Sequence, residues 1–206
     1  MYKNCFKRVF DFILSLTALI ILSPIFLILI IIGTVQMQGN PFFTQERPGR
    51  DEKIFKLIKF RSMSNRKDKE GNLLPDEERI TNYGEFIRKT SLDELPELFN
   101  ILKGDMAIVG PRPLLVKYLP YYTEEERLRH SVRPGLTGLA QINGRNNLDW
   151  DPRLTLDVQY VNNLSLLNDI RILIATVFKV FRREDVATIG NFKVLDLDEA
   201  RKDQNG

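Results

Sequence analysis

The run FILSLTALIILSPIFLILIIIGTV, residues 12–35, decides how the rest of this sequence is interpreted. The 34 residues 12–45 contain no ionisable side chain, and the run itself is almost entirely Leu, Ile, Phe and Val. An apolar stretch longer than about 18 residues is a candidate membrane segment. A cleaved signal peptide is the alternative, but the apolar region is too long and no small-residue cleavage site closes it. We therefore expect residues 1–38 to be a retained membrane anchor.

The middle of this run carries Ser23 and Pro24. Proline lacks an N–H and clashes with the carbonyl four residues earlier, so a kink or break is expected there. Each half then spans roughly 17 Å, less than the ~30 Å hydrocarbon core of a bilayer. Lys7 and Arg8 precede the run and Arg47 follows it, which favours keeping both ends on the cytoplasmic side. From these residues alone, a re-entrant helix-break-helix and a straight single span both stay open.

Composition excludes several classes of protein. The 206 residues are enough for one domain of ordinary size, and a net charge of +3 gives no sign of nucleic-acid binding. The basic excess lies in residues 1–63, as expected for a surface that faces anionic headgroups or a phosphorylated lipid. The single cysteine, Cys5, excludes an intramolecular disulfide, and the single histidine, His130, excludes a multi-His metal centre.

The rest of the chain predicts a mainly helical α+β domain over residues 39–190. We expect a short strand over 55–63, a polar loop over 64–79, and helices that end near 103, 132 and 183. The last helix, residues 166–183, is amphipathic and is expected to lie either in the membrane interface or in the core. Residues 191–206 are expected to form a flexible acidic tail.

The segment TSLDELPEL, residues 90–98, is the first of three candidate sites of chemistry. Ser91 and Glu94 fit a capping box, and acids suit the first turn of a helix, so a structural function is the simpler interpretation. A helix start nearer Asp93, or a kink at Pro96, would instead place both carboxylates at an irregular junction from which they can project. Both interpretations stay open at this point.

The other two candidate sites are basic and rich in glycine or proline. In IVGPRP, residues 108–113, two prolines present Arg112 rigidly, which suits bidentate phosphate binding, although a plain turn has comparable weight. In RPGLTGLAQINGR, residues 133–145, three glycines permit close backbone approach to an anion beside Gln141 and Arg145. This second segment is neither a Walker A motif nor a dinucleotide fingerprint.

Together, and in this order, the motifs resemble the small monotopic phosphoglycosyl transferases of bacterial glycoconjugate assembly, the bacterial sugar transferase family. The resemblance covers about residues 3–160. The matching segments are Lys7-Arg8 with Asp11, Ser23-Pro24, QERPG at 45–49, KFRSM at 59–63, RKTSLDELP at 88–96, GPRP at 110–113 and the block at 133–145.

The resemblance implies a re-entrant anchor in the inner (cytoplasmic) membrane and a catalytic domain on its cytoplasmic face. It implies transfer of a sugar phosphate from a UDP-sugar to polyprenyl (undecaprenyl) phosphate, with Mg²⁺ as cofactor and downstream membrane glycosyltransferases as further partners. Asp93 would attack the β-phosphorus and release UMP, while Glu94 would hold the metal. A carboxylate is already ionised at pH 7 and needs no histidine as a base.

The residues implied to bind substrate phosphates are Arg112 first, then Lys59, Arg88, Gln141 and Arg145. Asp157 is expected to be a further metal or nucleotide contact. N,N′-diacetylbacillosamine is the first sugar expected, followed by other N-acetylhexosamines, galactose or glucose.

Two other classes of function compete with this one. A metal-dependent glycosyltransferase that releases UDP would use an Asp-x-Asp motif, and both residues 149–151 and residues 196–198 fit that short pattern. A membrane-anchored scaffold would bind a UDP-sugar without turnover.

Overall fold

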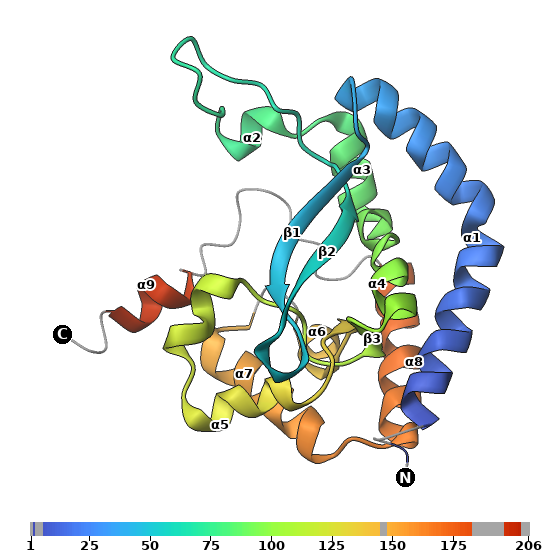
Figure 1. Cartoon of the computed structure of the whole chain (residues 1–206), viewed down its shortest axis with the longest axis vertical. Coiled ribbons are helices and arrows are strands. Elements are labelled where there is room, and N and C mark those ends of the chain that lie inside the picture. Colours follow the sequence, from blue (N-terminus) through green and yellow to red (C-terminus); the bar gives the residue numbers. More distant parts are fainter. Residues whose placement is uncertain (1, 3–5, 145–147, 183–195, 203–206) are drawn as a thin grey trace.

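The computed structural model describes residues 2, 6–144, 148–182 and 196–202. Helices form most of this part of the chain, together with two small two-stranded sheets. The predicted mainly helical α+β class is therefore confirmed. Figure 1 shows the long N-terminal helix α1 along one side of the molecule, with the hairpin of β1 and β2 at its centre.

Helix α1 (Lys7–Met37) is continuous over 31 residues and contains Pro24, and Figure 1 shows that its axis bends part-way along. Pro24 cannot donate to the carbonyl oxygen of Ile20, and the Ser23 hydroxyl donates to that oxygen instead, at 2.8 Å. One continuous bent helix agrees with the kink expected at Pro24, whereas the break in the helix-break-helix that the resemblance implied is absent from α1. By length and composition alone, α1 is the one helix in the described part of the chain that could cross a membrane.

Buried polar side chains fasten the N-terminal half of α1 to the domain. The Lys7 ammonium lies 2.8 Å from the carboxylate of Asp169 in α8 (Leu166–Arg182). The same carboxylate accepts a hydrogen bond from the hydroxyl of Tyr160 in α7 (Trp150–Asn162), at 2.8 Å. One helical turn after Lys7, Asp11 accepts a hydrogen bond from the backbone N–H of Ile108. Because these groups are almost fully buried, they fix α1 against α7 and α8.

Arg8 joins α1 to the end of α4 (Glu97–Lys103). Its guanidinium donates to the carbonyl oxygens of Ile101 and Leu102, at 2.5 and 2.6 Å. The last carbonyls of a helix have no partner within the helix and carry partial negative charge, so a guanidinium there is favourable. Gly104 ends α4 in the left-handed conformation, as the sequence predicted.

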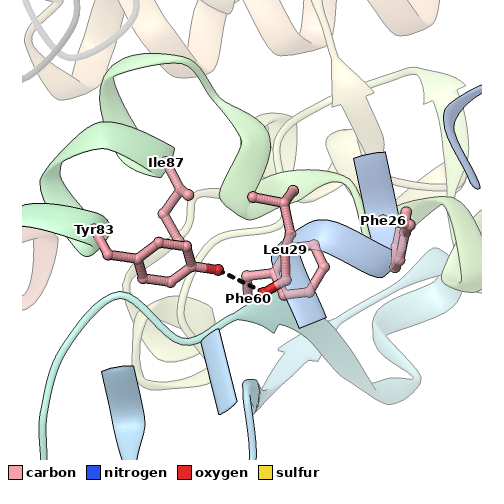
Figure 2. Packing of buried hydrophobic residues seen from close by; sticks show 5 residues of the cluster. All are labelled: Phe26, Leu29, Phe60, Tyr83 and Ile87. Atoms are coloured by element: carbon pink, nitrogen blue, oxygen red, sulfur yellow. Dashed lines mark hydrogen bonds between the residues drawn. The ribbon is translucent and has the colours of Figure 1, made fainter. Parts of the chain in front are cut away.

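Apolar contacts fasten the C-terminal half of α1. Figure 2 shows Phe26 and Leu29 packed with Phe60, Tyr83 and Ile87, and the Tyr83 hydroxyl donating to the Leu29 carbonyl oxygen at 3.1 Å. The opposite side of α1 exposes isoleucines, leucines and valines along its length. Both halves of α1 are therefore docked on one domain, and its outer side is apolar.

The two sheets carry the segments that meet at the site. Strands β1 (Phe42–Pro48) and β2 (Ile54–Phe60) are antiparallel and are joined through the short helix η2 (Arg50–Glu52). Strand β2 corresponds to the predicted strand.

The polar segment 64–79 projects from the molecule in Figure 1 and ends in the single turn α2 (Asp76–Arg79). It leads into α3 (Asn82–Lys89). Strands β3 (Ala107–Val109) and β4 (Gly135–Thr137) are parallel, and α6 (Leu139–Asn143) follows β4.

The helix expected over 118–132 is divided into three pieces, η4 (Val116–Tyr121), α5 (Glu124–Arg127) and η5 (Leu128–Ser131). Pro120 lies inside η4, and Thr123 begins a new helix with a capping box. Tyr118 and Tyr122 are buried, so these aromatic residues serve the core.

Helix α8 confirms the predicted amphipathic helix, but most of its large apolar residues face outward. Figure 1 shows α8 beside the N-terminal half of α1, so the two helices contribute to one apolar side of the molecule. The exposed residues are Leu166, Leu167, Ile170, Ile174, Val177 and Phe178.

Part of the expected flexible tail is a docked helix, α9 (Leu197–Lys202). Leu197 is fully buried against the cluster around Tyr118. Lys117 pairs with Asp196 at 2.5 Å and with Asp198 at 3.1 Å. One apolar residue and these ion pairs hold a segment whose acidic composition predicted a loose tail. The rest of the predicted tail lies outside the described residues.

We predict that Asp169→Asn lowers the free energy of unfolding by about 3 kcal/mol, because buried Lys7 then keeps only its longer ion pair with Asp11, at 3.6 Å. Denaturant unfolding in detergent measures this loss. Lys103→Gln is the control, since the Lys103 side chain is 74% exposed in its pair with Asp105, and it should cost less than about 1 kcal/mol. Equal stability of Asp169→Asn and the wild type would contradict this function of Asp169.

Candidate active site

Asp93 and Glu94 lie in a tight turn. Ser91 adopts the left-handed conformation with φ 56° and forms no capping hydrogen bond, so the capping box proposed as the simpler interpretation is absent. Asp93 and Glu94 form the end of the short 3₁₀ helix η3 (Leu92–Glu94), and α4 begins directly after Pro96. The irregular junction that was the alternative interpretation of the sequence is thus the observed one.

Two basic side chains converge on Glu94. The ammonium of Lys59, near the end of β2, lies 2.8 Å from Glu94 Oε1, and Nη2 of Arg112 lies 2.6 Å from the same oxygen. Although burial opposes ionisation, these two cations hold the pKa of Glu94 well below its usual range. Glu94 is therefore a fixed anion whose second oxygen accepts no contact from another described side chain.

Asp93, by contrast, has neither a hydrogen-bond partner nor an ion-pair partner for its carboxylate in the described part of the chain. Burial, with the neighbouring charge of Glu94, raises its pKa to about 6. The carboxylate is therefore largely ionised at pH 7, and no direct contact reduces its nucleophilicity. Lys59, Arg112 and Arg88 lie close enough to moderate that pKa shift.

Glu97 is a site residue that the sequence analysis missed. It is 2% exposed, and its Oε1 lies 3.1 Å from the Lys59 ammonium. Burial and the charge of Glu94 raise its pKa to about 7. In the sequence Glu97 looks like an ordinary acid in the first turn of a helix. Only its ion pair with Lys59, which the structure reveals, marks it as a site residue.

Backbone contacts between β3 and β4 hold the Arg112 loop. The Gly110 N–H donates to the Thr137 carbonyl oxygen at 2.8 Å, and the Gly135 N–H donates to the Pro111 carbonyl oxygen at 2.9 Å. A Cβ built on Gly135 would lie 2.1 Å from the Gly110 nitrogen, so only glycine permits this approach. The Gly-Pro-Arg-Pro motif and the glycines of residues 133–145 therefore form one packed unit that presents Arg112.

Asp157 supports this unit from behind and does not meet the acidic pair. It forms a buried ion pair with Arg129 at 2.8 Å, and Arg129 also donates to the Arg112 carbonyl oxygen at 2.7 Å. The Asp157 carboxylate is thus engaged by a guanidinium, and its position favours a supporting function over the expected metal or nucleotide contact. His130, beside Arg129, is also buried, and burial with that charge lowers its pKa to about 3.

The remaining predicted residues divide between the site and the framework. Arg88 donates to the Ser62 hydroxyl at 2.8 Å. Its charge also acts to lower the pKa of Asp93. Gln141 is buried in α6 and donates to the Leu136 carbonyl oxygen, so it supports the glycine-rich block. Arg145 lies outside the described residues.

Neither Asp-x-Asp pattern forms a site of this kind. Asp196 and Asp198 both bind Lys117 and hold α9, as described above. Asp149 directly precedes α7, and the Asp151 side chain is 78% exposed and lies 3.3 Å from Arg201. No observation in the described part of the chain favours a glycosyltransferase built on these residues.

Comparison with known proteins agrees with this geometry. The model of the bacterial sugar transferase family matches residues 2–183. The chain belongs to this family. An uncharacterized sugar transferase of Bacillus subtilis, EpsL, is 50% identical over 180 residues, which are 87% of this chain and 89% of that protein. This sugar transferase is therefore a bacterial phosphoglycosyl transferase, as the order of its motifs predicted.

Longer relatives carry more specific names. The undecaprenyl-phosphate galactose phosphotransferase of Salmonella typhimurium is 42% identical over 86% of this chain and 41% of that protein. The UDP-glucose:undecaprenyl-phosphate glucose-1-phosphate transferase of Klebsiella pneumoniae is 42% identical over 85% of this chain and 40% of that protein. This sugar transferase thus spans about two fifths of the length of those two relatives.

We predict that Asp157→Asn destabilises the sugar transferase by about 3–5 kcal/mol, because Arg129 is left buried without its carboxylate. Transferase activity should fall as Arg112 loses its support, and added magnesium should not restore it. Thermal unfolding and activity measured across a magnesium titration test this. Asp151→Asn, on the same helix, should match the wild type. Restoration of Asp157→Asn by magnesium would show that Asp157 is a metal ligand after all.

Proposed function

We propose that this sugar transferase moves a sugar phosphate from a UDP-sugar to polyprenyl (undecaprenyl) phosphate through a covalent intermediate on Asp93. The observation that carries the proposal is the contrast between the two adjacent acids. Asp93 has no partner among the described residues and lies in an irregular turn, whereas Glu94 is paired with Lys59 and Arg112. One carboxylate is free to attack, and its neighbour holds the cations that the transferred phosphate needs.

In the first step, an Asp93 carboxylate oxygen attacks the β-phosphorus, and the bond from that phosphorus to the α-phosphate oxygen breaks. UMP leaves with the electron pair of that bond, and the sugar phosphate is held on Asp93 as an acyl phosphate. In the second step, a phosphate oxygen of the polyprenyl phosphate attacks the same phosphorus. The bond to Asp93 breaks, and polyprenyl-diphosphate-sugar is released with the carboxylate regenerated. Neither step requires a general base.

The carboxylates of the site fit Mg²⁺, which is commonly bound through one or two protein carboxylates together with substrate phosphates. Among the described residues, no group of three or more His, Cys, Asp or Glu side chains could hold a metal alone. Glu94 would supply its second oxygen, and the diphosphate would supply further ligands. When bound, the ion would neutralise charge on the diphosphate.

The docking of α1 supports a re-entrant anchor. Its 31 residues would extend about 46 Å if straight, more than the ~30 Å of a hydrocarbon core. Lys7 and Arg8 hold its first turn to the domain, and Tyr83 holds its C-terminal half to the same domain. We infer that α1 enters the inner membrane and returns, with α8 in the interface and the catalytic domain on the cytoplasmic side.

The sugar is proposed at the level of its class. The relatives named for galactose and glucose favour a UDP-hexose, and UDP-N,N′-diacetylbacillosamine or another UDP-N-acetylhexosamine is the donor expected from the sequence. A panel of these donors in the assay below identifies which one is used.

The mechanism is tested by incubating the enzyme with Mg²⁺ and each UDP-sugar in turn, without lipid. Each UDP-sugar is labelled at the β-phosphorus. We expect stoichiometric UMP release and label fixed to Asp93, with both signals lost in Asp93→Asn and kept in Asp76→Asn, an exposed control. Release of UDP would support the Asp-x-Asp alternative. Binding without release would support the scaffold, and full activity of Asp93→Asn would refute the nucleophile.

Cysteine accessibility tests the topology. In a Cys5→Ser background, Lys3→Cys and Asn40→Cys should both react with an impermeant maleimide only from the cytoplasmic side, because both ends of α1 lie on one domain. Labelling of one position from the opposite side would establish a spanning helix.

A further inference from the structure

The motif Gln45-Glu46-Arg47-Pro48-Gly49 has no part in the function described so far, although its arginine lies beside the site. Arg47 is near the end of β1, opposite Phe55 of β2. Gln45, two residues earlier and so on the same face of the strand, accepts a hydrogen bond from Arg47 Nη2 at 2.7 Å. Nη1 reaches the Pro113 carbonyl oxygen at 3.4 Å. The guanidinium is thus aimed at the Arg112 loop.

Arg47 has only neutral hydrogen-bond partners in the described part of the chain, unlike the three arginines near it that form ion pairs. Arg112 pairs with Glu94, Arg129 with Asp157, and Arg127 with Glu52. Within the described residues, no carboxylate lies in ion-pair distance of Arg47, and its Nε is shielded from solvent without an acceptor. A guanidinium has five N–H donors, so Arg47 retains donors that no described residue uses.

The surroundings of Arg47 oppose its charge. Burial and the neighbouring charge of Arg112 both lower its pKa, and the charge of Glu97, which is itself paired with Lys59 at 3.1 Å, offsets them only in part. A half-buried cation beside a second cation is unfavourable unless an anion binds between them. The chemistry that would relieve this arrangement is a phosphate, which guanidiniums bind in a bidentate manner.

Which phosphate it binds follows from the direction of attack. In phosphoryl transfer the attacking and leaving oxygens are roughly in line, so the leaving group lies on the side of the β-phosphorus that faces away from Asp93. Arg88, Lys59 and Arg112 influence the charge of Asp93, whereas the main neighbours of Arg47 are Arg112, Glu97 and the tyrosines at 118 and 122. Arg112 is therefore the cation that acts on both the nucleophile and Arg47.

We propose that Arg47 binds the α-phosphate of the nucleotide sugar, the group that leaves as UMP, and forms with Arg112 a clamp across the diphosphate. This inference rests on the proposed function. Arg112 then serves the phosphoryl group that is transferred, and Arg47 stabilises the charge that develops on the leaving group.

Calorimetric titration with UMP and with uridine tests this without turnover or a known sugar. For Arg47→Gln we expect UMP affinity to fall at least about tenfold, which is about 1.4 kcal/mol, with uridine affinity unchanged. Arg47→Lys keeps the charge but not the fork, and should be intermediate. Arg50→Gln is the matched control on the same hairpin, where Arg50 is 54% exposed and pairs only with Asp51 among the described residues.

Melting curves check that each variant is folded. If Arg47→Gln does not fold, Arg47→Lys provides the test. The KM for polyprenyl phosphate should be the same in wild type and Arg47→Lys, which separates the nucleotide phosphate from the lipid phosphate. Equal UMP affinity of Arg47→Gln and wild type, or an equal loss for UMP and uridine, would overturn the inference while the proposed function stands. If the wild type binds no UMP, the nucleotide donor itself is refuted, and the inference with it.

Discussion

The contact between α1 and α4 is the interaction on which the rest of the structure depends. Arg8 donates to the last carbonyl oxygens of α4, and the first residue of that helix is Glu97, which holds Lys59 in the site. One helix of seven residues thus joins the apolar segment to the acidic cluster. α1 is held to the domain from Lys7, which pairs with Asp169, to Leu29, which accepts a hydrogen bond from Tyr83. The site therefore keeps a constant position relative to the apolar surface of α1. This is the constraint that an enzyme with a long-chain lipid substrate requires.

Charge balance explains how three acids can share so small a volume. Asp93, Glu94 and Glu97 would repel one another strongly if they were alone, and burial together with the charge of Glu94 raises the pKa values of the other two. Lys59 bridges two of the acids, and Arg112 binds one. Among the described residues the cations leave Asp93 without a direct partner, so the most weakly held acid is the one that the proposed mechanism uses as nucleophile.

Prediction from the sequence succeeded where the cause is local. The extent of α8 and the end of α4 at Gly104 depend on periodicity and on one left-handed residue, which neighbours within a few positions determine. The convergence of Lys59 and Arg112 on Glu94 joins residues 35 and 18 positions apart, and the family resemblance implied only that these residues share one site. Glu97 was missed because an acid in the first turn of a helix is common. Helix α9 was missed because its acidic composition conceals the one leucine that anchors it.

The stereochemical course at the β-phosphorus tests the central claim most directly. A UDP-sugar of single configuration at an isotopically or thio-substituted β-phosphorus is converted with polyprenyl phosphate, and the configuration of the product is determined. Two in-line displacements, the first by Asp93 and the second by the lipid phosphate, invert the centre twice and give net retention. We predict retention. Net inversion would mean a single direct displacement by the lipid and would contradict the covalent intermediate.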